Sequence, residues 1–147
     1  MSELNKLLYQ TIKNDPEFKT LTGGAVQDPR IYKRKTPVKL EISDIKRSFV
    51  VYYIAGTTKV GSPKIEIAQR NNKTYGLEVY GKKDTDVEQI AERIERLFYE
   101  EQFLTDSYRI GYTYATRGRV DFDEDRKLYT ETMFVFFTKI LALNLAS

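Results

Sequence analysis

The stretch from residue 85 to residue 101, TDVEQIAERIERLFYEE, predicts the clearest structural element of this chain. Thr85 and Glu88 have the spacing of a capping box, in which two side chains bond backbone amides of the first helical turn. Six carboxylates against two arginines give the polar face a local charge of −4. The apolar residues follow the 3.6-residue period of one helix face and are Val87, Ile90, Ala91, Ile94, Leu97 and Phe98. We therefore expect an amphipathic helix with an acidic outer face.

Three strands are expected before this helix and two after it. Residues 49–55 are apolar throughout and fit a central strand covered on both faces, whereas 64–68 and 75–80 alternate between apolar and polar residues. Between the second and third of these strands, Arg70-Asn71-Asn72-Lys73 is typical of a hairpin loop. Residues 128–141 predict a long last strand. The strand before it places four residues on one face, which are Tyr108, Ile110, Tyr112 and Tyr114.

A helix over residues 2–14 is expected at the start of the chain. Ser2 can cap it, four apolar residues form one stripe, and Asn14-Asp15-Pro16 stops it. The expected fold class is therefore α+β, a mixed or antiparallel sheet of four to five strands with an N-terminal helix and one long amphipathic helix packed on it. A chain of 147 residues suits a single domain over 1–147.

Residues 24–47 are irregular and predict a long basic loop or arm. Pro29 and Pro37 interrupt the segment, and seven basic against three acidic residues give it a local charge of +4. A loop of this length in a small domain is typical of a segment that binds something. The basic arm and the acidic face of 85–101 are complementary, and head-to-tail contact between such patches generates a ring when the rotation closes. Two unrelated solvated surfaces would give the same charge pattern.

Enzymatic chemistry has little support in this composition. With 0 Cys and 0 His, a thiolate nucleophile, a histidine base and a Cys/His zinc site are excluded. An acidic run at 121–125 resembles a calcium loop, but Arg126 stands where the turn needs Gly and Thr132 where a bidentate Glu is required. We therefore predict no catalytic residue, no cofactor-binding residue and no metal ligand, and a protein that is not an enzyme.

No membrane association is expected, because no apolar run reaches the roughly 20 residues of a membrane span. The start of the chain lacks the cationic and apolar regions of a signal peptide, so we expect an intracellular protein.

A nucleic-acid-binding function is the alternative interpretation. Aromatic residues on strands beside Lys and Arg are typical of stacking platforms for single strands. No RNP1-like string occurs, and aromatic residues at a period of two also fill cores and sheet surfaces. The tyrosines that could form such a platform are Tyr52, Tyr53, Tyr75, Tyr80, Tyr112 and Tyr114.

Several short motifs follow one another in a distinctive order. The first are Leu7-Leu8, Asn14-Asp15-Pro16-Glu17-Phe18, Leu21-Thr22-Gly23-Gly24 and Arg30-Ile31-Tyr32. An apolar strand at 49–54, a strand and a helix within 75–101, and an acidic turn at 121–125 before the last strand come next. This order, from about residue 4 to residue 140, resembles the tail-completion or tail-terminator family of long-tailed bacteriophages, which joins tail to head. The charged insertion at 39–48 departs from that family, which often has a Pro-rich stretch there.

The resemblance implies a structural virion protein of the phage neck, a ring that terminates the tail tube and joins the tail to the head connector. It implies a homo-oligomer, a hexamer in the family, with the tail-tube protein and the head-connector or stopper protein as partners, and no cofactor. DNA would only pass through the lumen. The protein would be found in the virion neck, and in the host cytoplasm during assembly. Combined with the charge pattern, it predicts interface residues on the arm and on the neighbouring helix, which are Arg30, Lys33, Arg34, Lys35, Glu88, Glu92 and Glu95.

Overall fold

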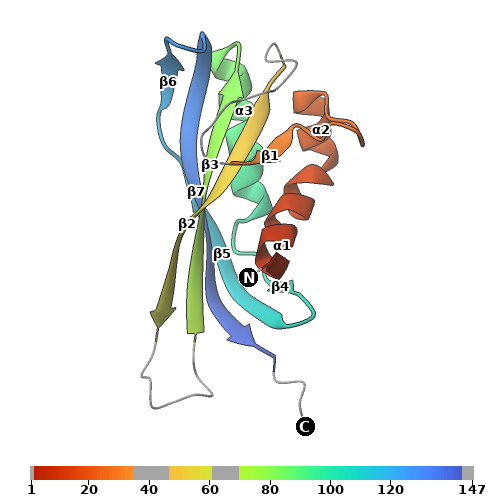
Figure 1. The fold of residues 1–147 in the computed structure, drawn as a ribbon, viewed down its shortest axis with the longest axis vertical. Helices are drawn as coiled ribbons and strands as arrows, with labels where there is room; N and C mark the ends of the chain where they lie inside the picture. Colours follow the sequence, from red (N-terminus) through yellow and green to blue (C-terminus); the bar gives the residue numbers. More distant parts are fainter. Residues whose placement is uncertain (1, 35–46, 61–69, 144–147) are drawn as a thin grey trace.

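A computed structural model describes residues 2–34, 47–60 and 70–143 of the chain. Within these residues, three helices and seven strands follow one another (Figure 1). The elements are α1 Ser2–Lys13, α2 Pro16–Thr22, β1 Ile31–Lys33, β2 Phe49–Val60, β3 Arg70–Gly81, α3 Asp84–Leu97, β4 Phe103–Leu104, β5 Tyr108–Thr116, β6 Val120–Asp123 and β7 Leu128–Ala142.

The strands form one curled mixed sheet with the order β1-β2-β3-β7-β5-β4. β1 runs parallel to β2, and the other neighbouring strands are antiparallel. β7 is the longest strand, with 15 residues, and it changes its partner along its length. Residues 128–131 of β7 pair with β6, whereas residues 134–142 pair with β5. β6 and β5 therefore pair with the same edge of β7, one after the other along its length.

The expected fold class was wrong. The described part of the chain is mostly β, with seven strands and three short helices in place of four to five strands, an N-terminal helix and one long amphipathic helix. Two physical reasons explain why strands were missed. The predicted loop at 70–73 belongs to β3 and pairs with β2, because backbone groups form a ladder whether or not the side chains are apolar. β4 and β6 have 2 and 4 residues, too few to show a period.

The amphipathic helix is shorter than expected and is capped differently. α3 begins at Asp84 after Lys83 and ends at Leu97, so Thr85 lies inside the helix and the predicted capping box is not formed. Glu100 has a φ of 51°, a left-handed conformation that turns the chain away from the helix axis. The predicted strand at 64–68 lies outside the described residues.

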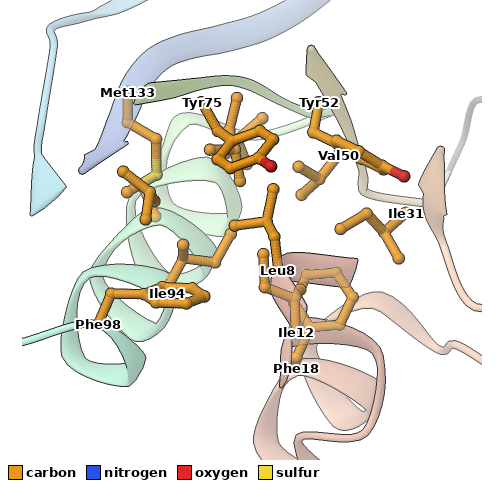
Figure 2. Close-up of a cluster of buried hydrophobic side chains, with 14 of the residues drawn as sticks. Leu8, Ile12, Phe18, Ile31, Val50, Tyr52, Tyr75, Ile94, Phe98 and Met133 are labelled. Atoms are coloured by element: carbon orange, nitrogen blue, oxygen red, sulfur yellow. The ribbon is translucent and has the colours of Figure 1, made fainter. Parts of the chain in front are cut away.

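All three helices pack on one face of the sheet and enclose the main core (Figures 1 and 2). Leu8 and Ile12 of α1, Phe18 of α2 and Ile94 of α3 belong to this core, and each is fully buried. A smaller cluster lies apart from this core. It consists of Phe49, Val51, Tyr80 and Leu128, with Tyr32 packed against it.

Asp15 joins α2 to α3. Its carboxylate accepts a hydrogen bond from the Phe18 backbone N–H at 2.9 Å, which caps α2, and two more from Arg93 on α3, at 2.6 and 2.9 Å. The hydrogen bonds from Arg93 lower the pKa of Asp15, while burial opposes them. Gly23, with a φ of 69°, then ends α2 in the left-handed region, where glycine is favoured.

We expect Asp15→Ala to lower the free energy of unfolding by about 2–3 kcal/mol, because it removes a helix cap and the partner of Arg93 together. Asp15→Asn keeps a capping side chain and loses only the charge, so it should lose about half as much. Urea unfolding of both variants measures the two effects. If both variants lost the same free energy of unfolding, helix capping by residue 15 would account for no part of the effect, and this prediction would be contradicted.

Candidate interaction surfaces

Arg30, expected on the basic arm, is fully buried inside its own chain. Its Nε donates to the Ser48 carbonyl at 3.2 Å, and its Nη2 donates to the Arg47 carbonyl at 2.7 Å. Nη1 donates to Asp28 and to the Tyr32 hydroxyl, at 3.1 and 3.2 Å. The guanidinium thus joins the chain before residue 34 to the chain after residue 46, and it is not offered to a neighbouring subunit.

The other residues of the arm lie in different settings. Arg34 is anchored to its own sheet, because its Nη1 lies 3.0 Å from Glu78 Oε1 and its guanidinium lies 4.9 Å from the centre of the Tyr53 ring. Lys33 is exposed and forms no ion pair with any residue that the structure describes. Lys35 lies outside the described residues, as does the rest of the arm to residue 46.

The three carboxylates predicted on α3 also differ. Glu92 is exposed and forms an ion pair with Arg96, one turn along the helix. Glu95 is half-buried and close enough to Arg117 to contribute to the raised pKa of that guanidinium, whose main cause is its hydrogen bond to Glu131. Glu88 is exposed and has no ion pair among the described residues. Among the residues that the structure describes, no ion pair joins the arm to α3.

The acidic turn between β6 and β7 is organised by Asp123. Its carboxylate accepts hydrogen bonds from the backbone amides of Asp125 and Arg126, at 3.0 and 3.1 Å, and from Arg126 Nη1 at 2.7 Å. Arg126 and these amides lower the pKa of Asp123. Over residues 2–34, 47–60 and 70–143, no three acidic side chains are grouped to hold a metal ion. The same residues contain no helix long and apolar enough to cross a membrane.

The six tyrosines of the possible stacking platform do not share one surface. Tyr52 and Tyr75 belong to the main core and Tyr80 to the smaller cluster. Tyr112 and Tyr114 lie near each other, with ring centres 5.9 Å apart, and Tyr114 stacks on Phe136 at 4.5 Å. Only part of the predicted platform is therefore available to a base.

Burial of tyrosines makes the fold sensitive to alkali. Desolvation is the main cause that raises the pKa of Tyr32 to about 12, and it also raises the pKa of Tyr75 and of Tyr80. A phenol whose pKa is higher in the folded than in the unfolded chain stabilises the fold fully below the unfolded value of 10.0, and this contribution is lost as the pH rises through the folded value.

We therefore expect the free energy of unfolding to fall steadily above pH 10. Phenolate absorbance at 295 nm, measured with circular dichroism during an alkaline titration, should show a group of tyrosines that ionise only as the fold is lost. Complete ionisation with an intact fold would contradict this prediction.

The surface of the described chain has hollows beside α3 and beside β4. One, of about 300 Å³, lies between α2 and α3 and is lined mainly by charged side chains that already pair, Arg93 with Glu17 and Arg96 with Glu92. The other, of about 410 Å³, lies beside β4. It is lined by Gln102, Phe103, Leu104, Arg109 and Leu143.

Lys73 is a residue that the sequence did not single out. It falls in the predicted hairpin loop, yet the structure places it within β3, paired with Thr57 of β2 and Phe137 of β7, and only 4% exposed. A lysine in a polar run gives no sign of burial, so only the register of the extended hairpin could have revealed it.

No protein-family model and no curated protein sequence matches this chain. Among solved structures, the fold is similar to that of a chain in the virion of a native gene transfer agent particle, with a TM-score of 0.66. The superposition covers 91% of this chain and 91% of that chain, at 12% sequence identity. At this identity the likeness shows a shared fold, and it extends over nearly the whole of both chains. The tail-completion family indicated by the motif order stays a prediction.

Proposed function

We propose that this chain is a structural protein of a phage-like virion, and that it forms a ring at the neck that terminates the tail tube and joins the tail to the head connector. The observation that carries the proposal is the similarity in fold, over 91% of both chains, to a component of a gene transfer agent virion. The order of motifs along the sequence adds the position at the neck. The protein would act in the virion and be assembled in the host cytoplasm.

The proposed ring is built by head-to-tail contact of opposite charges. Lys33 on one copy and Glu88 on the next supply the main contact, because neither has an ion pair within the described chain. Arg34, Glu92 and Glu95 contribute less, since charged groups of their own chain lie beside them. Lys35, which the sequence predicts as an interface residue, is proposed as a further contact.

The proposed partners are further copies of this chain, the tail-tube protein and the head-connector or stopper protein. DNA would pass through the lumen without being bound. The chain would carry out no reaction, since its composition offers neither a thiolate nor an imidazole.

Light scattering tests the proposal. The mass of the protein, measured alone and with the tail-tube protein at low and high salt, should show a species of about six copies, or one that forms only with the tube. Electron microscopy of that species should show closed rings. A protein that stays monomeric and does not respond to the tube protein would overturn the proposal.

A small single-strand-binding function is the second candidate, and the pair formed by Tyr112, 36% exposed, and Tyr114 favours it. Binding to an oligonucleotide would then fall steeply with salt concentration. Tyr112→Ala, with Tyr99→Ala as a control for an exposed tyrosine elsewhere, should weaken that binding. Unchanged binding in Tyr112→Ala, or no binding by the wild type, would remove this candidate.

A further inference from the structure

The starting observation is an unprotected edge of the sheet at β4. Sheet edges present free backbone groups that can pair with another chain, and folded proteins usually protect them with charged side chains. Among the described strands, β1 and β6 also lie at edges, and they carry Lys33 and two aspartates respectively. β4 has no such protection, because Phe103 and Leu104 are apolar and the residue on each side of them is uncharged.

The register shows which backbone groups of β4 are free. In an antiparallel pair, residues that bond the partner strand alternate with residues whose N–H and C=O point away from it. The Thr105 N–H donates to the Tyr108 carbonyl at 2.8 Å, and Leu104, the neighbouring residue, lies opposite Arg109. The N–H and C=O of Leu104 therefore point away from β5, toward the open edge. The Leu104 residue is 71% exposed.

The hollow of about 410 Å³ lies at this edge. Phe103, Leu104 and Leu143 supply its apolar wall, and Gln102 and Arg109 complete the lining. Arg109 is exposed and forms no ion pair with any residue that the structure describes. A free guanidinium beside an apolar hollow suits a ligand that carries both an apolar side chain and a carboxylate.

Together, the open edge, the hollow and the cation fit an extended peptide segment. Backbone hydrogen bonds to Leu104 would hold the segment as a further strand, a mode of recognition in which a peptide is added to a sheet edge. Leu104 and Arg109 are cross-strand partners, so their side chains lie on one face of the sheet. Alternate side chains of the added strand share that face, so an apolar and an acidic residue two positions apart would meet the hollow and the guanidinium.

Charge favours a different protein over a second copy as the source of this segment. β1 of a second copy would bring Lys33 toward Arg109, and β4 of a second copy would bring another Arg109, so like charges would oppose both contacts. β6 has two aspartates, but each already pairs with an arginine of its own chain, at 3.5 and 2.7 Å. Within the described ranges, no edge strand therefore offers an unpaired carboxylate.

We propose that the free edge of β4 is a docking site for an extended segment of another virion protein. The segment adds to the sheet as a strand, places an apolar side chain in the hollow and directs a carboxylate to Arg109. The inference rests on the proposed function for the source of the partner, and it assigns to that partner a surface of this chain outside the proposed contact between copies.

Two variants test the site through binding to the tail-tube protein and to the head-connector protein. Leu104→Pro removes an N–H that β5 does not use, and proline is tolerated at such a position of an edge strand. Arg109→Glu reverses the charge beside the hollow. Each variant should raise the Kd for the partner by roughly tenfold or more and leave self-assembly unchanged.

Matched controls exist for both variants. Leu104→Val keeps the N–H and an apolar side chain, and Arg119→Glu reverses an arginine that is 89% exposed beside β6. Both should bind the partner as the wild type does. Circular dichroism shows whether each variant is folded, and if Leu104→Pro is not, Arg109→Glu decides the outcome.

Amide hydrogen exchange gives a readout that is specific to strand addition. The Leu104 N–H should exchange rapidly in the isolated protein and roughly tenfold or more slowly in the complex, because it then donates to the added strand. Binding without protection of this amide would overturn the strand-like mode of docking.

The outcomes separate this inference from the proposed function. Partner binding that is unchanged in Leu104→Pro and Arg109→Glu would overturn the docking site and leave the proposed function standing. Variants that lose self-assembly but keep partner binding would identify a second copy as the occupant and overturn the choice of partner. A wild type that forms rings yet binds neither protein would overturn the docking site and the joining role, but not the ring.

Discussion

Arg30→Met is expected to lower the free energy of unfolding by about 3–4 kcal/mol, one of the two largest effects that a single substitution should have in this chain. The guanidinium is fully buried and donates to the carbonyls of Arg47 and Ser48 and to Asp28. Methionine fills much of the volume but donates nothing, so these acceptors lose this donor, and the carbonyl of Ser48 loses it in a buried setting. Urea unfolding followed by tyrosine fluorescence measures the loss.

Arg30→Lys is the matched control. It keeps the charge but replaces the planar fork with one ammonium, which cannot reach all of the acceptors at once, so an intermediate loss is expected. The φ of 62° at position 30 disfavours Arg, Met and Lys alike, so backbone strain cancels in the comparison. A loss below about 1 kcal/mol in Arg30→Met would show that the hydrogen bonds are replaced by water and would contradict the assignment.

The helices were the most predictable part of this fold. The apolar stripe of 85–101 predicted the buried face of α3, where Val87, Ile90, Ala91 and Ile94 lie fully in the core. Periodicity reports which face is buried, but it does not report where the helix ends. Phe98 is buried although it lies beyond the end of α3, and the chain turns at Glu100. The segment after the helix is held by β5, because the Glu100 N–H donates a hydrogen bond to the Thr113 carbonyl at 2.9 Å.

The full length of the strands could not be predicted from the sequence, for a different reason. β2 and β3 continue into polar residues, and in these segments the cross-strand backbone bonds, not apolar side chains, define the strand. Alternation also failed along β5. Ile110 and Thr113 are both fully buried although they lie three positions apart, while Tyr112 and Tyr114 lie on the other face. A strand of regular alternation would have kept Ile110, Tyr112 and Tyr114 together.

The irregularity in β5 has a counterpart in β7. Gly111 lies against Lys139, which has a φ of 53°, and a Cβ at position 111 would approach the Lys139 Cβ to 3.1 Å. Phe137 and Ile140 are both buried three residues apart, as Ile110 and Thr113 are. Both strands therefore change face at the same level of the sheet, a feature set by their pairing and not by either sequence alone.

The candidate interface was the least predictable part. Composition identified a basic arm and an acidic helix, but charge counts do not distinguish a buried arginine from an exposed one. Arg30 is a buried residue, and Arg34 forms an ion pair with Glu78 of its own sheet. Lys73, within the predicted loop, became a nearly buried cation. Each outcome depends on contacts between residues far apart in the sequence, which no local pattern contains.

Arg117→Met is expected to lower the free energy of unfolding by about 3–5 kcal/mol, because it leaves a buried carboxylate without its partner. Arg117 Nε and Nη2 donate to the two carboxylate oxygens of Glu131 at 3.0 and 2.8 Å, and the Glu131 side chain is 0% exposed. The pair lies where β7 exchanges β6 for β5, next to Gly118, where a Cβ would stand 2.3 Å from the Thr132 carbonyl oxygen.

The double variant Arg117→Met with Glu131→Met distinguishes the loss of unfolding free energy caused by an unpaired buried charge from the net stabilisation that the ion pair contributes. Replacing both members of a buried ion pair by apolar side chains of similar size is often neutral or stabilising, so the double variant should recover most of the stability that Arg117→Met loses. Denaturant unfolding of the wild type, both single variants and the double variant completes the cycle. If the double variant were as unstable as Arg117→Met alone, the loss would arise from packing at the junction of β5, β6 and β7, and the electrostatic account of this pair would fall.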